Sequence, residues 1–195
     1  MTVPTPNLIN GCAIAGAVLT GGASRRMGRD KALLEVAGVV MARRVADVIR
    51  ACGCGPVVAI GGDAAGLAAV GLVSITDRWP GEGPLGGILT ALEWASVDSP
   101  TCVLVVATDL PWLDAATVGA LIAHLGRTDV DVVAARSDRL EPLCALWWPS
   151  AVATLAGRFA GGERAVHRAI TALRCHEVTV APRALTNVNT PGDLD

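Results

Sequence analysis

The sequence predicts a three-layer α/β domain in which helices cover both faces of a mostly parallel β-sheet. Short apolar segments alternate along the chain with segments of helical periodicity. The apolar segments have no polar face, which is typical of strands buried on both sides. The 195 residues suffice for one well-buried domain, and the 52% hydrophobic content with 22 glycines suits closely packed layers.

The predicted strands are apolar runs that stop at glycine, proline or a polar residue. In chain order they cover residues 14–19, 57–60, 72–76, 102–107, 130–135, 143–147 and 177–180. The predicted helices cover residues 39–52, 86–95, 115–125, 151–159 and 164–173. We expect residues 1–13 to form a flexible extension and residues 14–195 a single domain.

Local sequence supports two of these helices in particular. The helix over 39–52 places apolar side chains on one face and charged ones on the other, and glycines end it. The apolar positions are Val45, Val48 and Ile49, the polar ones Arg43, Arg44 and Asp47, and the glycines Gly53 and Gly55. Asp114 is well placed as the N-cap of the helix over 115–125.

Charge and cysteine spacing exclude several classes of protein. The formal net charge is -2 with both signs mixed, so no basic surface for a nucleic-acid backbone is expected. The six cysteines lack the spacing of a zinc or redox motif. No stretch approaches the roughly 18 to 20 apolar residues of a membrane span, and the start has neither a basic nor an apolar leader segment. We expect a cytoplasmic monomer without membrane or nucleic-acid partners.

Residues 17–31, with the sequence A-V-L-T-G-G-A-S-R-R-M-G-R-D-K, carry the strongest functional pattern. Glycines allow backbone N–H groups to turn toward an anion, and Arg25, Arg26 and Lys31 add positive charge. The spacing fits neither the P-loop nor the dinucleotide-binding fingerprint, so it predicts a different phosphate-binding loop. One of the two arginines is expected to contact phosphate and the other solvent, and the sequence leaves open which.

Polar residues and glycines follow several of the predicted strands. They are Gly21, Gly22, Gly62, Asp63, Asp77, Thr108 and Asp109. In open parallel sheets ligands bind at the carboxyl ends of the strands, so these residues are expected to converge on one crevice.

Asp109 is the predicted metal ligand. It follows the most apolar strand, and Asp114 is better spaced to cap the next helix, which leaves Asp109 available. Mg²⁺ is usually held by one or two carboxylates together with substrate phosphates and water. The sequence therefore predicts a magnesium site at Asp109, with Mn²⁺ as an alternative ion.

Other candidate residues have weaker support. Asp77 precedes a loop, where either a turn role or a ligand role is open. Gly83 and Gly87 flank a loop without bulky side chains that leads into a helix, as a substrate-binding loop requires. Asn187 and Asn189 place two amides on one side of an extended segment, where both can donate and accept hydrogen bonds.

Together these segments resemble the molybdenum cofactor guanylyltransferases, within the wider group of nucleotidyltransferases with a Rossmann-like α/β fold. The family's opening pattern, L-A-G-G-x-S-x-R-M-G-x-D-K, matches residues 19–31 except that Thr20 replaces alanine. The further matching segments are Asp77, G-P-L-G-G-I at 83–88, T-D-L-P at 108–111, E-P-L-C-A-L at 141–146 and N-V-N-T-P at 187–191. The departures are Gly86, where alanine is frequent, and Gly192, where glutamate is usual. The resemblance extends from Ala15 to nearly the end of the chain.

The resemblance implies transfer of GMP from GTP to the terminal phosphate of the molybdopterin (Mo-molybdopterin) cofactor, with release of pyrophosphate. It also implies a role for each matching residue. The nucleotide would be lined by Leu19, Thr20, Gly21 and Gly22, with Asp63 nearby. Lys31 would contact its phosphates and Asp77 its nucleoside. Asp109 would hold Mg²⁺, and Asn187 and Asn189 would lie near the pterin or complete the metal environment. Transient contact with cofactor-inserting proteins or molybdoenzymes follows by the same analogy.

This chemistry requires no protein nucleophile, because the attacking phosphate is already an anion. The Ser, Cys and His residues form no triad-like arrangement in the sequence. Catalysis would come from alignment and charge neutralisation, for which Lys31, Asp109 and Arg25 or Arg26 are the candidates.

Three alternatives to guanylyl transfer remain at this point. One is a cytidylyltransferase acting on the same pterin, although the pair Gly21-Gly22 favours the guanine branch. Another is a nucleotidyltransferase with a different phosphorylated acceptor. The last is a non-catalytic nucleotide sensor, which the presence of both Lys31 and Asp109 disfavours.

Overall fold

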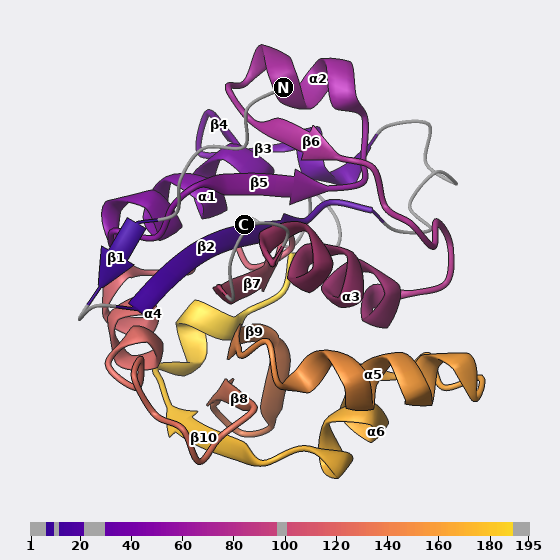
Figure 1. Ribbon diagram of the computed structural model, residues 1–195. Coiled ribbons are helices and arrows are strands. Elements are labelled where there is room, and N and C mark those ends of the chain that lie inside the picture. Colours follow the sequence, from indigo (N-terminus) through magenta and orange to yellow (C-terminus); the bar gives the residue numbers. More distant parts are fainter. Residues whose placement is uncertain (1–6, 10–11, 22–29, 97–100, 189–195) are drawn as a thin grey trace.

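The computed structural model describes residues 7–9, 12–21, 30–96 and 101–188. Within them, helices pack on both faces of an eight-stranded sheet (Figure 1). The strands are β1 (Asn7–Ile9), β2 (Cys12–Leu19), β5 (Val57–Ile60), β6 (Val73–Ile75), β7 (Cys102–Ala107), β8 (Val132–Arg136), β9 (Leu140–Trp147) and β10 (Cys175–Thr179), and β3 (Glu35–Val36) pairs separately with β4 (Val39–Val40). The α-helices are α1 (Met41–Ala51), α2 (Ala64–Ala69), α3 (Pro84–Ala95), α4 (Ala115–Ile122), α5 (Ala151–Ala160) and α6 (Val166–Ala169).

The sheet order is β10-β8-β9-β7-β2-β5-β6, with β1 paired to β2. β2 is parallel to both of its long neighbours, β5 and β7, and the β5–β6 and β8–β10 pairs are parallel as well. β9 runs antiparallel to β7 and β8. The predicted α/β class with a mostly parallel sheet is therefore confirmed.

Side chains of alternating direction along β2 contribute to two separate cores. Ile14 and Val18 belong to the core that includes α1 and α4, whereas Ala17 and Leu19 belong to the core that includes α3 and α5. Figure 1 shows these two groups of helices on opposite sides of the sheet. Burial on both faces explains why the strands carry no polar face.

The direction of β9 differs from that of the other long strands because its connection to β8 is short. The chain turns within residues 137–139, where Ser137 N–H donates to the carbonyl of Arg139 (3.1 Å). A parallel connection would need a crossover of a dozen or more residues. The register then shifts between Ala134 and Ala135, opposite the segment that contains Pro142. Proline cannot donate to the ladder, so it fits this irregularity.

Several elements differ from the sequence prediction. Asn7–Ile9 form β1, where the prediction has a flexible extension over 1–13. The first long helix begins at Met41, since Val39–Val40 pair with Glu35–Val36. The helix over 164–173 is divided into α6 and a 3₁₀ turn, Ile170–Ala172. Helix α2 was not predicted, because its six residues are too few for a clear periodicity.

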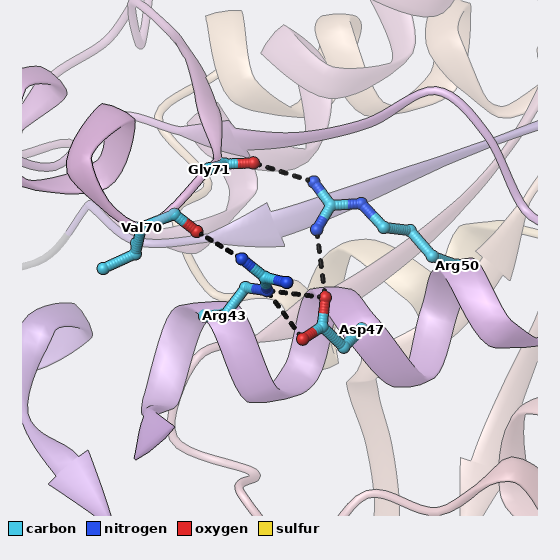
Figure 2. Close-up of polar contacts among 5 residues, drawn as sticks. All are labelled: Arg43, Asp47, Arg50, Val70 and Gly71. Carbon is cyan, nitrogen blue, oxygen red and sulfur yellow. Dashed lines mark hydrogen bonds and ion pairs between the residues drawn. The ribbon is translucent and has the colours of Figure 1, made fainter. Parts of the chain in front are cut away.

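Arg43 and Arg50 attach α1 to the end of α2 (Figure 2). Arg43 donates to both oxygens of Asp47 and to the carbonyl of Val70 (3.0 Å), and Arg50 bonds Asp47 and the carbonyl of Gly71 (3.2 Å). Val70 and Gly71 directly follow α2, so the guanidinium groups satisfy carbonyls at a helix C-terminus. These charges of α1 thus have a structural role.

Asp131 fixes the entry of the edge strand β10. Its oxygens accept from the backbone N–H and the Nε of Arg174 (both 3.0 Å), from Nη2 of Arg174 (2.7 Å) and from the hydroxyl of Ser150 (2.6 Å). The Arg174 guanidinium holds the pKa of the Asp131 carboxyl well below its usual range.

Among the described residues, no helix is long and apolar enough to cross a bilayer.

Gly16 is required by the packing of α1 on β2. A Cβ at this position would lie 2.6 Å from Ile49 Cγ2 and 2.9 Å from Val57 Cγ2, inside contact distance. We expect Gly16→Ala to lower the free energy of unfolding by about 1–3 kcal/mol, because the core must shift to admit the methyl group. Urea denaturation measures this change.

Gly119→Ala is the matched control, since a Cβ on this residue of α4 meets no atom within 4 Å. Alanine has the higher helix propensity, so this variant should be stabilised by up to about 1 kcal/mol. Equal destabilisation of the two variants would contradict the packing argument.

Candidate active site

The topology of the sheet places a switch point of the strand order at the carboxyl ends of β2 and β7. From β2 the chain proceeds to β5 and β6 on one side, and then returns to β7 on the other side of β2. Ligands of open α/β sheets bind outside the carboxyl ends of the strands where the order reverses in this way. The predicted site residues follow these strands.

The glycine turn after β2 is held against the end of β5. The N–H groups of Thr20 and Gly21 both donate to the carbonyl of Ile60 (3.1 and 3.0 Å). Gly61 has φ +75°, and a Cβ on it would lie 3.2 Å from Gly21 Cα. Glycine is therefore needed on the β5 side for the two turns to approach each other.

Thr20 occupies the position where the family pattern has alanine, and its hydroxyl is used within the fold. The Oγ1 atom lies 3.0 Å from the carbonyl oxygens of both Ile60 and Gly61. A Cβ on Gly62 would lie 2.9 Å from this oxygen. The side chain of Thr20 is thus directed toward β5, and it is buried.

Lys31 and Asp109 form an ion pair although 78 residues separate them. Lys31 Nζ lies 3.2 Å from Asp109 Oδ2, and the two side chains are 20% and 29% exposed. Thr108 fixes the segment before Asp109, since its N–H and hydroxyl both bond the carbonyl of Leu19 (3.2 and 2.8 Å). The structure therefore brings together the predicted phosphate-binding cation and the predicted metal ligand.

The segment that contains Asn187 reaches the same place. The backbone N–H of Val188 donates to the carbonyl of Asp109 (2.9 Å), and Val188 is buried. Asn187, which is half-buried, directly precedes Val188, so this bond also holds its backbone near Asp109. The segments that contain residues 31, 109 and 187 therefore lie together, and the roles that the resemblance implies for these residues stay predictions.

Asp63 has a structural contact that the sequence prediction did not include. Its side chain accepts from the N–H of Ala65 (3.1 Å) and caps α2. The neighbouring carboxylate of Asp30 was not among the predicted site residues, yet it accepts from the N–H groups of both Ala32 (3.0 Å) and Asp63 (2.9 Å). Asp30 thereby connects the start of the Lys31 turn to the β5–α2 loop. Asp30 is the N-cap of the 3₁₀ turn Lys31–Leu33, and aspartate at such a position is the sequence signal that could have indicated this capping role.

Asp77 has the turn role that the sequence left open, and its ligand role stays a prediction. One oxygen, Oδ1, accepts from the N–H of Trp79 (3.0 Å) and from the hydroxyl of Thr90 (3.1 Å). The other, Oδ2, lies 3.8 Å from the point where a Cβ on Gly21 would stand. The carboxylate therefore both fixes its own turn and faces the glycine turn.

Residues 84–87 form the first turn of α3, so the helix begins two residues before the predicted start at 86 and takes up most of the loop predicted over 83–87. Gly83 is the exposed N-cap with φ +84°, and Pro84 begins the helix, which suits proline because its missing N–H is not needed there. Gly87 is buried, and a Cβ on it would lie 3.2 Å from Leu19 Cδ2. Its small size allows α3 to approach β2.

Gly22, Arg25, Arg26 and Asn189 lie outside the described residues. Within the residues that are described, no group of three or more His, Cys, Asp and Glu side chains could hold a metal ion. A single carboxylate nonetheless suits Mg²⁺ when the nucleotide phosphates supply the other ligands. Asp109 Oδ1 accepts no hydrogen bond in the described part of the chain, so it fits that role.

A mostly parallel α/β sheet with a glycine turn, a lysine and a carboxylate at its switch point defines a nucleotide-binding enzyme of the nucleotidyltransferase class. The chain belongs to the family of MobA-like NTP transferase domains, whose sequence profile matches residues 16–180.

Relatives with assigned activities align over almost the full chain. A probable molybdenum cofactor guanylyltransferase of Opitutus terrae is 36% identical over 193 residues, which cover 95% of each chain. The molybdenum cofactor guanylyltransferase of Rhodobacter capsulatus is 34% identical over 187 residues, or 93% of each chain.

Solved structures share the fold. Molybdopterin-guanine dinucleotide biosynthesis protein A of Archaeoglobus fulgidus superimposes with a TM-score of 0.74 at 23% identity, covering 92% of this chain and 94% of its own. A 4-diphosphocytidyl-2C-methyl-D-erythritol synthase of Anaerococcus prevotii gives a TM-score of 0.73 at 11% identity, covering 94% and 95%. Because proteins named for different nucleotides share this architecture, the fold alone does not select the base.

Asp30 is expected to stabilise the Lys31 turn. In Asp30→Ala the N–H groups of Ala32 and Asp63 lose their acceptor, so the free energy of unfolding should fall by about 1–2 kcal/mol in urea denaturation. Asp138→Ala is the control, because this exposed carboxylate makes no hydrogen bond within the described chain. An equal loss of stability in both variants would contradict the role of Asp30.

Proposed function

We propose that this protein transfers GMP from GTP to the terminal phosphate of the molybdopterin cofactor, releasing pyrophosphate and forming the guanine dinucleotide cofactor. The observation that carries the proposal is the Lys31–Asp109 pair at the carboxyl ends of β2 and β7. A partly exposed ion pair contributes little to stability, about 1 kcal/mol or less. Its position beside the glycine turn instead suits the binding of a polyphosphate. The relatives named molybdenum cofactor guanylyltransferases support the choice of base and acceptor.

Each part of the site has a defined task in this proposal. The turn from Leu19 to Gly22 lines the nucleotide, and Asp77, which faces Gly21, contacts the nucleoside. Lys31, together with Arg25 or Arg26, neutralises the triphosphate. Asp109 holds Mg²⁺, which when bound would stabilise charge on the phosphates. Asn187 and Asn189 would contact the acceptor.

The transfer is a displacement at the α-phosphorus of GTP. An oxygen of the acceptor phosphate forms the new P–O bond as the bond to the β-phosphate oxygen breaks, and pyrophosphate leaves with that electron pair. The attacking group arrives as an anion, so the protein supplies alignment and positive charge. Burial raises the pKa of the Cys54, Cys102 and Cys144 thiols to about 12. These three cysteines are therefore not thiolates at neutral pH and are not suited to act as nucleophiles.

Such a reaction uses nucleotide and cofactor available in the cytoplasm, which we propose as the place of action. The protein would act as a monomer and deliver its labile product through transient contact with cofactor-inserting proteins or molybdoenzymes.

The direct test is pyrophosphate release with Mg²⁺ and molybdopterin cofactor, comparing GTP, CTP and ATP. We expect release with GTP, and a loss of at least about 100-fold in Asp109→Ala because the metal ligand is removed. The Asp138→Ala variant controls for loss of a carboxylate. Preference for CTP would mean cytidylyl transfer, and absence of release with every nucleotide would contradict the proposed activity.

Lys31→Ala should lower kcat/KM by about 100-fold or more, since a preorganised charge at the phosphates is lost. Lys31→Arg keeps the charge and should retain more activity than the alanine variant. Circular dichroism melting should change little, because a partly exposed ion pair contributes about 1 kcal/mol or less to stability. Near-normal turnover of Lys31→Ala would disprove its role.

A further inference from the structure

Most arginines of the described chain are paired with a carboxylate, and the exceptions are informative. The paired residues are Arg43, Arg50, Arg78, Arg127, Arg136, Arg164, Arg168 and Arg174. Arg44, Arg139, Arg158 and Arg183 have no such pair within the described residues. Two of these four, Arg44 and Arg183, lie against the same aromatic ring.

That ring is the indole of Trp112. The guanidinium carbon of Arg44 lies 5.5 Å from the ring centroid, and that of Arg183 lies at the same distance. Arg44 comes from α1 and Arg183 from the 3₁₀ turn Pro182–Leu185, so elements distant in sequence supply the two cations. Arg44 Nε also donates to the carbonyl of Pro111 (2.7 Å), which fixes its direction.

The position of Arg44 contrasts with that of its neighbour on the same helix. Arg43 is fully engaged by Asp47 and Val70 and holds α1 to the end of α2, as Figure 2 shows. Arg44 points instead to the segment after β7, where it meets a carbonyl and an aromatic ring but no carboxylate. The carbonyl and the ring fix the direction of Arg44, and neither Arg44 nor Arg183 has a carboxylate as counterion within the described residues, so the pair carries positive charge that an anion could neutralise.

The cluster of Arg44, Trp112 and Arg183 is joined to the candidate active site through the backbone. Trp112 packs in a small apolar cluster with Val188, and the N–H of Val188 bonds the carbonyl of Asp109 (2.9 Å). Trp112 also follows Asp109 by only three residues. The ring that both cations contact is thus linked to the Asp109 segment by packing on Val188 and by the chain itself.

The cluster lies on the side of the site away from the nucleoside. Gly21 and Asp77 are on the β5–β6 side of β2, whereas Trp112 follows β7 on the other side. The Lys31–Asp109 pair stands between them at the ends of β2 and β7. A ligand that meets the nucleotide phosphates at this pair would extend from there toward Trp112.

We propose that Arg44, Trp112 and Arg183 form the binding site for the anionic acceptor substrate, a phosphorylated heterocycle. The inference rests on the proposed transfer reaction and assigns its second substrate to residues outside the matching sequence segments. Guanidinium groups form paired, charge-assisted hydrogen bonds with phosphate oxygens, and their planes stack on flat rings. The two guanidinium groups would therefore hold the acceptor phosphate, next to the segment that leads back to Asp109.

Steady-state kinetics of Arg183→Gln test this assignment. Arg183 is exposed, and its side chain donates no hydrogen bond to another described residue, so the variant should fold normally. We expect KM for the molybdopterin cofactor to rise about ten-fold or more, with KM for GTP unchanged, because one charge-assisted contact to the acceptor is lost. Arg183→Lys should recover part of the affinity.

Arg158→Gln is the matched control, since it removes an exposed, unpaired arginine from α5 on the opposite face of the sheet. Its kinetics should equal those of the unmodified protein. An unchanged acceptor KM in Arg183→Gln, or a rise in KM for GTP instead, would overturn the assignment.

Calorimetric titration of molybdopterin cofactor without nucleotide separates this inference from the proposed function. Weaker binding by Arg183→Gln than by Arg158→Gln supports the acceptor site even if no nucleotide is turned over. If both variants bind the acceptor equally and turn over nucleotide, the proposed transfer reaction stands and the proposed acceptor site is wrong. Absence of binding to the unmodified protein rejects both.

Discussion

The carbonyl groups of Leu19 and Ile60 hold the carboxyl end of the central strand in place. Ile60 accepts from Thr20 and Gly21, and Leu19 accepts from Thr108, so the glycine turn is fixed from both neighbouring strands. These bonds are available only because β2 is parallel to β5 and to β7, which brings three strand ends to one level. The position of Asp109 next to the glycine turn follows from this arrangement.

The site is built from backbone geometry to a larger extent than from side-chain chemistry. Glycines permit the close approach of the turns after β2 and β5, and Gly87 permits the approach of α3. The carboxylate of Asp77, a candidate ligand-binding group, also accepts a hydrogen bond from the N–H of Trp79 in its own turn. Such double use keeps the acidic groups in fixed directions before any ligand arrives. It suits a reaction that depends on alignment more than on acid or base strength.

Much of the fold and part of the site follow from the sequence, and the exceptions have physical reasons. Apolar runs located most of the strands, and turn residues at their ends located the crevice, because both depend on local composition. The direction of β9 depends on the length of its connection and on pairing with distant strands, which no periodicity reports. The capping role of Asp63 and the bridging role of Asp30 depend on which N–H groups lie nearby in space. Arg44 and Arg43 are adjacent in sequence and equally charged, and only their neighbours in the fold distinguish them.

The pairing of Lys31 with Asp109 has a consequence for how charge changes when a ligand binds. In the chain without ligand each group acts as the counterion of the other, so neither is left bare in a partly dehydrated crevice. A polyphosphate that brings its own cation offers a new partner to each of them at once. In the proposed reaction, binding would exchange one internal ion pair for two external ones. A nucleotide without a cation would offer a partner to the lysine only and would leave the carboxylate facing like charge, so the proposed roles of Lys31 and Asp109 would favour the metal-bound form of the nucleotide.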